Sequence, residues 1–335
     1  MKTKMKKYPL LVSLIVSCVI VVASLFILGF FGMNLGTSLG GGSQFDIKLE
    51  NDASTVQTTA KVKSAIRKNG YIMDSSFVED RFVATEENGK FTIKCLVVKI
   101  ASKNISDEKK QAIIDSVAEA LDISTDQISS IENITSSIKA KNVLFVGLAV
   151  GLIAICLFVL GWVRYNIFAG LSFILAYLHN IILYLSVLIL TRVQLNLVSL
   201  SVVIILTLAM SCLLIAVYEK NRQYELSKSD AKMSVSERMW QSEKEVSKPF
   251  IIVATAILVF ALLLFFVPVA SVRFAAINII IAVIITAYTS ILIGPGTYAS
   301  LMEIKVYNEK SVLSRNENVN KEIKKKVNKG TKKSK

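Results

Sequence analysis

The sequence predicts a polytopic α-helical membrane protein with six transmembrane helices and one soluble α+β domain between the first two helices. Of its 335 residues, 53% are hydrophobic, and the mean hydropathy is +0.55, which is not the balance of a soluble chain of this length. In addition, the stretch from Asn142 to Arg164 carries no charge before its last residue. A bilayer core takes about 20 apolar residues as a helix, because lipid cannot hydrogen-bond an exposed backbone.

The first segment, residues 1–33, is predicted to combine a short cytoplasmic stub with transmembrane helix 1. Four lysines precede an apolar run from Tyr8 to Met33, and lysine-rich flanks stay in the cytoplasm. This run is longer than the core of a cleaved signal peptide. The segment Ile15–Cys18 resembles a lipoprotein cleavage site, but further apolar residues follow it, which favours an uncleaved anchor.

Residues 34–141 are expected to form the soluble domain, which begins at a glycine-rich turn or linker. Gly36, Gly41 and Gly42 are candidate hinge residues, because glycine adopts backbone conformations closed to other residues. The apolar spacing then predicts the element order β-α-β-β-α-β of a ferredoxin-like split unit. The predicted elements are strand 45–49, helix 58–68, strands 77–84 and 91–100 joined by a hairpin at 86–89, a helix after the N-cap Ser106, and strand 128–134.

Five further apolar runs complete the predicted membrane block. They place transmembrane helices 2–4 in 142–218, a cytoplasmic loop at 219–248, helices 5–6 in 249–304 and a basic cytoplasmic tail at 305–335. An even number of spans puts both termini inside and the soluble domain outside. The charges agree, because the predicted loop holds seven Lys/Arg and the segment 321–335 holds eight Lys.

The net charge of +14 is concentrated outside the soluble domain. Residues 43–141 hold 14 Lys/Arg and 15 Asp/Glu, a net charge of −1, so the remainder of the chain carries +15. We interpret this excess as a topology signal and as attraction of the basic termini to anionic lipids, with no nucleic acid as a partner.

The sequence offers no catalytic or metal-binding pattern. Three of its four cysteines lie in apolar runs and no Cys-x-x-Cys occurs, so neither a disulfide framework nor a zinc site is expected. We find no nucleophile–base pair and no nucleotide-binding loop, and therefore expect no enzyme activity and no cofactor.

Polar residues at membrane depth are functional candidates, because they are costly to bury in lipid. His179 and Asn180 fall in the middle of the third predicted helix and Ser211 in the fourth, and these three are the candidate intramembrane polar or proton-path residues. A proton relay through His179 is one reading, and an interhelical hydrogen bond is the favoured one. Arg164, Glu219 and Arg222 form a candidate motif at the cytoplasmic edge, where long charged side chains extend toward water.

The layout of one helix, an external ferredoxin-like domain and five helices resembles the SecF subunit of the bacterial SecDF protein-export complex, a member of the RND superfamily. Short motifs follow the same order along the chain as in that family. They are Asn34–Gly36 with Gly41–Ser43, Val163–Tyr165, Leu178–Asn180, Tyr218–Arg222, Val272–Ala275 and Gly296–Ser300.

The sequence also departs from the family pattern at positions where the family has acids. Ser38 and Asn180 stand where the family has Asp, and Leu213 is the likeliest counterpart of a fourth-helix Asp implicated in proton coupling. A polar stretch before the family's fifth helix is replaced by 237–243. Because no Asp or Glu lies in any of the five later predicted spans, the sequence favours a diverged member that does not itself couple protons.

The resemblance implies an accessory subunit of the Sec translocase in the bacterial cytoplasmic membrane. Its expected partners are a SecD-like subunit, a SecYEG-type channel and exported polypeptides. Two alternatives stay open. One is half of a proton-driven RND-type exporter of small molecules or lipids, which predicts an intramembrane carboxylate. The other is a membrane scaffold or sensor, which predicts a ligand pocket in the outer domain and no SecD-like partner.

Overall fold

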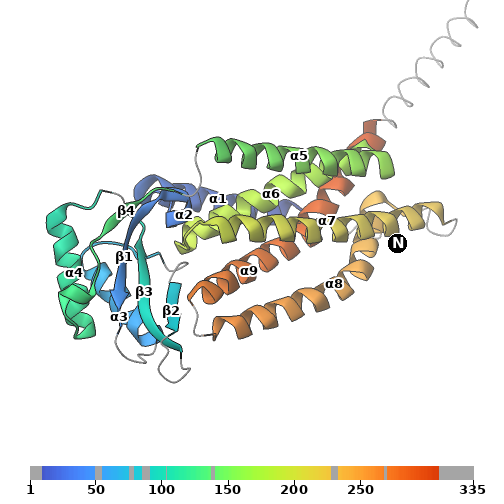
Figure 1. The fold of residues 1–335 in the computed structure, drawn as a ribbon. Coiled ribbons are helices and arrows are strands. Elements are labelled where there is room, and N and C mark those ends of the chain that lie inside the picture. Colours follow the sequence, from blue (N-terminus) through green and yellow to red (C-terminus); the bar gives the residue numbers. More distant parts are fainter. Residues whose placement is uncertain are drawn as a thin grey trace, which may run out of the picture.

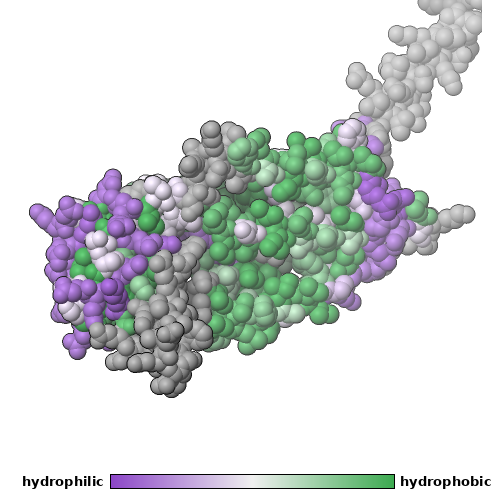
Figure 2. Space-filling model, viewed as in Figure 1, coloured by the Kyte–Doolittle hydropathy of each residue, from purple (hydrophilic) through white to green (hydrophobic). Residues whose placement is uncertain are grey.

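The chain forms an α/β unit at one end of a long bundle of helices (Figure 1). On the face shown in Figure 2, a hydrophobic band covers the bundle, whereas the described part of the α/β unit is mostly hydrophilic. This distribution is expected if lipid surrounds the bundle and water surrounds the unit. The computed structural model describes residues 10–49, 55–74, 79–84, 91–102, 104–136, 140–227, 233–267 and 270–308.

The α/β unit has the predicted element order, β-α-β-β-α-β. Its described strands form one antiparallel four-stranded sheet in the order β2-β3-β1-β4. The first strand is therefore central, and its Phe45 pairs with Val98 of β3. The elements are β1 (Gly42–Lys48), α3 (Thr55–Lys68), β2 (Glu79–Ala84), β3 (Phe91–Ile100), α4 (Asp107–Leu121) and β4 (Glu132–Ile134).

The core of the unit lies between the sheet and the two helices α3 and α4. Alternate residues of β1 are buried, as a strand with one covered face requires. The apolar stripes of both helices point into the same core, and the prediction of these stripes is confirmed. The core residues from these three elements include Phe45, Ile47, Val62, Ala65, Ile66, Ile113 and Val117.

Of three local expectations for the unit, the bounds of the last strand are wrong, the N-cap is confirmed in position, and the hairpin is not tested. The last strand is shorter than the predicted 128–134, because a 3-10 turn at Thr125–Gln127 leaves Ile128 only an isolated bridge to Ile47. Ser106 holds the N-cap position of α4, but its side chain makes no capping hydrogen bond to the described residues. The predicted hairpin at 86–89 lies outside the described residues.

Six helices in the described ranges are long and apolar enough to cross a membrane, as predicted. The last of them continues from α9 through a π-helical turn, η2 (Thr289–Ile293), and runs to Asn308. The helices are α1 (Leu10–Phe31), α5 (Ala140–Arg164), α6 (Ile167–Thr191), α7 (Leu197–Leu226), α8 (Val235–Phe265) and α9 (Ala270–Tyr288).

The predicted loop at 219–248 is largely helical. Helix α7 continues to Leu226, and α8 begins at Val235 after the N-cap Ser234, whose side chain accepts a hydrogen bond from the backbone of Glu237. Apolar length alone does not reveal these extensions, because their residues are polar. They are held by tertiary packing, since Met239 of α8 is 0% exposed within the same cluster as Tyr218 of α7.

The bundle has a packed centre and lipid-accessible outer helices. Helices α6, α7 and α9 contribute most of two buried clusters, one at each end of the bundle. The outer helices α1, α5 and α8 bury only a small share of their apolar stretches. Their exposed apolar side chains make up much of the band in Figure 2.

Candidate functional site

His179 is the centre of a polar cluster that joins three helices. Its Nε2 lies 2.8 Å from Oγ of Ser17 on α1, and its Nδ1 lies 3.1 Å from Oγ1 of Thr289 in η2. Because Ser17 uses its single proton toward the backbone oxygen of Ser13 or toward Tyr288, its oxygen accepts from Nε2 of His179. The neutral imidazole with its proton on Nε2 satisfies both contacts, since Nδ1 then accepts from the hydroxyl of Thr289. The side chain that the sequence singled out therefore makes interhelical hydrogen bonds.

The hydrogen-bonded chain continues from Ser17 to the end of α9. Oγ of Ser17 lies 3.1 Å from the hydroxyl of Tyr288, and that hydroxyl donates to the backbone oxygen of Ser13 on α1. Thr289, Ser17 and Ser13 are all at most 5% exposed. The cluster thus contains one titratable imidazole, and the sequence places no Asp or Glu in the apolar stretches of these helices.

The other two predicted intramembrane residues, Asn180 and Ser211, make no described hydrogen bond to this cluster. Asn180 faces Thr286 of α9, with both its amide atoms 3.4 Å from Oγ1. Ser211 donates to the backbone oxygen of Thr207 in its own helix. Leu213 is 4% exposed within an apolar cluster, so this position is filled by hydrophobic packing.

Arg164 and Glu219 form an ion pair at the end of the bundle far from the α/β unit. The guanidinium of Arg164 lies 3.1 Å from Oε2 of Glu219, and both side chains are partly exposed. Arg222 does not join this pair in the described contacts, but it lines an open groove along α5 together with Arg164. The neighbouring Tyr165 hydroxyl donates to the backbone oxygen of Ile215 at 3.0 Å.

Aromatic rings connect this ion pair to the last helix. The ring of Tyr218 lies 5.8 Å from that of Tyr165 and 4.9 Å from that of Tyr298. Asn166 caps α6 and donates to the hydroxyl of Tyr298 at 3.0 Å. Three of the motifs quoted above, around residues 164, 219 and 298, thus meet in one cluster. Their spacing in sequence gave no indication of this contact.

The segment that contains the candidate hinge glycines, residues 34–42 (the hinge segment), is hydrogen-bonded to the helical bundle. The side-chain amide of Asn34 donates to the backbone oxygen of Arg192 at 2.7 Å. The backbone oxygen of Asn34 accepts from the backbone N–H of Leu195 at 2.8 Å. The amide of Gly36 donates to the backbone oxygen of Leu195 at 2.9 Å. The segment after α1 therefore pairs with the connection between α6 and α7.

Asp74 of the α/β unit fixes the next residues of the same segment. It is 0% exposed, and its Oδ2 accepts hydrogen bonds from the backbone and the hydroxyl of Thr37, in the short helix α2 (Thr37–Gly40). Gly41 has a φ of +70°, and a Cβ on Gly42 would lie 2.1 Å from the backbone oxygen of Ile100. Glycine at 42 is needed for close packing in the sheet.

Sequence reasoning missed several of these groups. Asp74 was one carboxylate among the many in the soluble domain, and nothing in its neighbours marked it as buried. Tyr184 and Asn278, which are joined by a 2.7 Å hydrogen bond between α6 and α9, were also missed. Among the described residues, no group of three or more His, Cys, Asp or Glu could hold a metal ion.

Six helices long and apolar enough to cross a membrane, with an α/β unit between the first and the second, define a multi-pass membrane protein. Residues 109–303, more than half of the chain, match the family "Protein export membrane protein SecD/SecF, C-terminal". The chain belongs to this SecD/SecF family of protein-export membrane proteins.

Solved structures agree with this family. A crystal structure of SecDF in a super-membrane-facing form matches with a TM-score of 0.69 and 15% identity, over 90% of this chain and 39% of that chain. SecDF from Thermus thermophilus, described as translocon-associated, matches with a TM-score of 0.58 and 15% identity, over 88% and 38%. The chain therefore spans about two-fifths of these relatives. No curated protein sequence matches significantly.

Proposed function

We propose that the chain is a SecF-type accessory subunit of the Sec translocase, without enzyme activity, that assists polypeptide export across the bacterial cytoplasmic membrane. The observation that carries this assignment is the cluster around Tyr218. It brings together three segments that resemble separate SecF motifs, at residues 164–165, 218–222 and 296–300. Chance resemblances scattered over a helical chain have no reason to meet in space.

In this proposal both termini lie in the cytoplasm, and the α/β unit is an external ferredoxin-like domain. The sheet order β2-β3-β1-β4 supports the ferredoxin-like assignment. The basic residues of 219–248 and of the tail support the orientation. The external domain would engage polypeptide as it emerges from a SecYEG-type channel and oppose its backward movement.

A SecD-like subunit would supply the counterpart of the part of SecDF that this chain does not match. The contact of the hinge segment with the α6–α7 connection would carry movement of the bundle to the external domain. Asn34 and Gly36 bond to that connection, while Thr37 bonds to Asp74 of the domain. A shift of α6 relative to α1 would therefore displace the external domain through these hydrogen bonds.

Proton coupling in this proposal runs through the partner subunit. The family acids are replaced by Asn180 and Leu213, and both positions are filled by packed side chains. Returning a carboxylate, with Asn180→Asp or Leu213→Asp, is therefore expected to leave export unchanged or impaired. A pH-dependent gain of export in either variant would contradict this assignment.

The decisive experiment is affinity purification of the chain from its native membrane in mild detergent, with crosslinking and mass spectrometry. Recovery of SecD-like and channel subunits is expected. Recovery of neither, together with self-association, would overturn the proposal and favour an independent transporter or sensor.

A further inference from the structure

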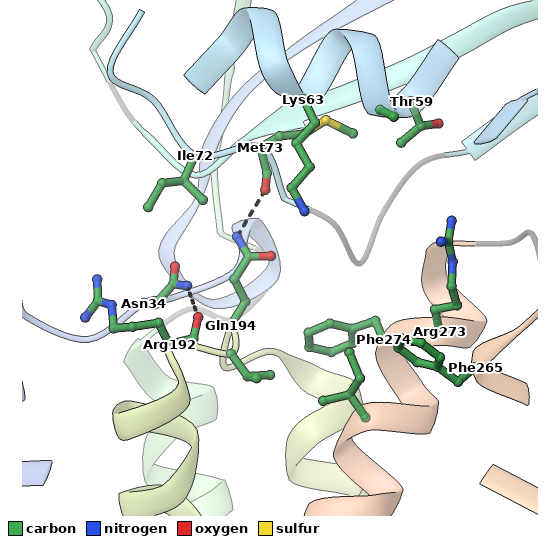
Figure 3. A pocket seen from close by; sticks show the side chains of 13 residues that line it. Asn34, Thr59, Lys63, Ile72, Met73, Arg192, Gln194, Phe265, Arg273 and Phe274 are labelled. Carbon is green, nitrogen blue, oxygen red and sulfur yellow. Dashed lines mark hydrogen bonds between the residues drawn. The ribbon is translucent and has the colours of Figure 1, made fainter. Parts of the chain in front are cut away.

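A pocket of about 490 Å³ lies between the α/β unit and the helical bundle. Figure 3 shows α3 above it and the ends of the membrane helices below it. On one side of the pocket, the side chain of Gln194 donates to the backbone oxygen of Met73, and that of Asn34 donates to the backbone oxygen of Arg192. The pocket therefore has walls from both parts of the molecule, and the interactions of the hinge segment described above hold these parts together.

The described lining contains three cations and no acid. Lys63 comes from α3, Arg192 from the end of α6 and Arg273 from the start of α9. Arg192 is anchored by a 2.6 Å hydrogen bond to the backbone oxygen of Gly32, and Arg273 forms no ion pair with any described residue. The guanidinium of Arg192 points away from Lys63 in Figure 3, so Lys63 and Arg273 are the cations that favour an anionic ligand, and a guanidinium group suits phosphate in particular.

The floor of the pocket is apolar. Phe274 of α9 lies beside Phe265 at the end of α8 in Figure 3, and Ile277 also lines the pocket. Phe265 is 40% exposed, and the adjacent Phe266 is 79% exposed. The pocket has walls from the unit and from the bundle, whose visible surfaces in Figure 2 are mostly hydrophilic and mostly hydrophobic, respectively. A boundary between two such surfaces is expected at the level of lipid phosphates and glycerol groups.

We propose that this pocket binds one anionic membrane phospholipid from the leaflet on the side of the α/β unit. The phosphate would lie between Lys63 and Arg273, and the first acyl carbons would run along Phe265 and Phe274. The volume is in the range of ligand pockets, and basic pockets between membrane helices bind lipid headgroups.

Two other occupants fit the pocket less well. A free phosphate ion would leave the aromatic floor without a partner. An exported polypeptide has no constant negative charge to match Lys63 and Arg273. One lipid phosphate held by both Lys63 and Arg273 would also join the α/β unit to the bundle, so the lipid would restrain movement between them.

The test uses the full chain in phosphatidylcholine vesicles that contain a small fraction of photoactivatable phosphatidylglycerol. After irradiation, mass spectrometry identifies the labelled peptides. We expect labelling of the segments around Lys63 and Arg273. Each neutralised cation should weaken binding about fivefold, so Lys63→Gln with Arg273→Gln should lower labelling about 25-fold at low lipid fraction. Lys61→Gln is the matched control, because Lys61 is exposed on the same helix and does not line the pocket.

A photoactivatable phosphatidylcholine tests charge selectivity in the wild-type chain, without any variant. Equal labelling by both lipids would overturn the proposal. Loss of labelling on adding inorganic phosphate would assign the pocket to free phosphate instead. Suppression by an unstructured acidic peptide would assign it to polypeptide. The readout is lipid labelling, so it is independent of whether the chain acts in export.

Discussion

The α/β unit buries mainly aliphatic side chains, whereas the helical bundle buries many polar side chains beside its apolar clusters. In the unit the most buried side chains are aliphatic, such as Ile47 and Ile113, each 0% exposed. In the bundle Ser, Thr and Asn side chains are buried, as at Thr289 with 0% exposure, while apolar side chains such as Phe30 are exposed, here at 80%. Water drives apolar groups together, whereas lipid gives helices no such drive and leaves packing and polar contacts to specify their arrangement.

The comparison predicts that apolar truncation has its largest effect in the unit. Ile47 lies on the central strand β1 within the core, and replacing it with alanine leaves a cavity. We expect Ile47→Ala to lower the free energy of unfolding of the unit by about 2–5 kcal/mol. Limited proteolysis of the purified chain in detergent, at increasing denaturant concentration, would measure this loss.

The matched control is an apolar truncation that faces lipid. Leu208 on α7 is 56% exposed, so Leu208→Ala removes few protein contacts. It should leave the unfolding of both regions nearly unchanged. An equal loss from both substitutions would show that the two regions are stabilised in the same way, and the comparison would fail.

The second prediction concerns the connection between the regions. Asp74→Ala removes the acceptor for two hydrogen bonds from Thr37 and leaves a buried amide unpaired, at a cost of about 1–3 kcal/mol. Hydrogen exchange at Thr37 and at the amides of β1 should accelerate, while exchange within α6 should not. Asp115 is exposed on α4, and Asp115→Ala is the control. Unchanged exchange at Thr37 would contradict a fixed hinge segment.

The third prediction measures polar contacts inside the bundle. His179→Ala breaks hydrogen bonds to Ser17 and Thr289, and such interhelical bonds average about 0.6 kcal/mol, with a maximum near 1.7. A double-mutant cycle with Ser17→Ala, followed by denaturation in mixed micelles, isolates one of these bonds. A coupling well above that maximum would mean that the His179 cluster does more than join helices.

Much of the fold follows from the sequence because its signals are local. Apolar length predicts the six spans, and apolar period predicts the order of strands and helices in the unit. The polar ends of α7 and α8 were not predicted, since their helical structure depends on burial of residues such as Met239 against distant segments. Periodicity carries no information about such contacts.

The candidate sites were predicted by residue type but not by arrangement. His179 stood out as the only histidine, and Arg164 with Glu219 stood out by position at a helix end. Their partners could not be read from the chain, because Ser17 is 162 residues from His179. Asp74 was missed, since burial of a single carboxylate is decided by the tertiary fold.

The smallest expected effect belongs to the ion pair of Arg164 and Glu219. The two side chains are 57% and 34% exposed, so water screens their attraction and the pair is worth about 0.2–1 kcal/mol. Glu219→Gln should lower the thermal stability of the bundle only slightly, and Arg164→Glu combined with Glu219→Arg should restore it. In about 1 M salt, where the screening length is near 3 Å, wild type and Glu219→Gln should melt together. A salt-insensitive loss much larger than this would place the pair in a dry environment, shielded by a partner subunit.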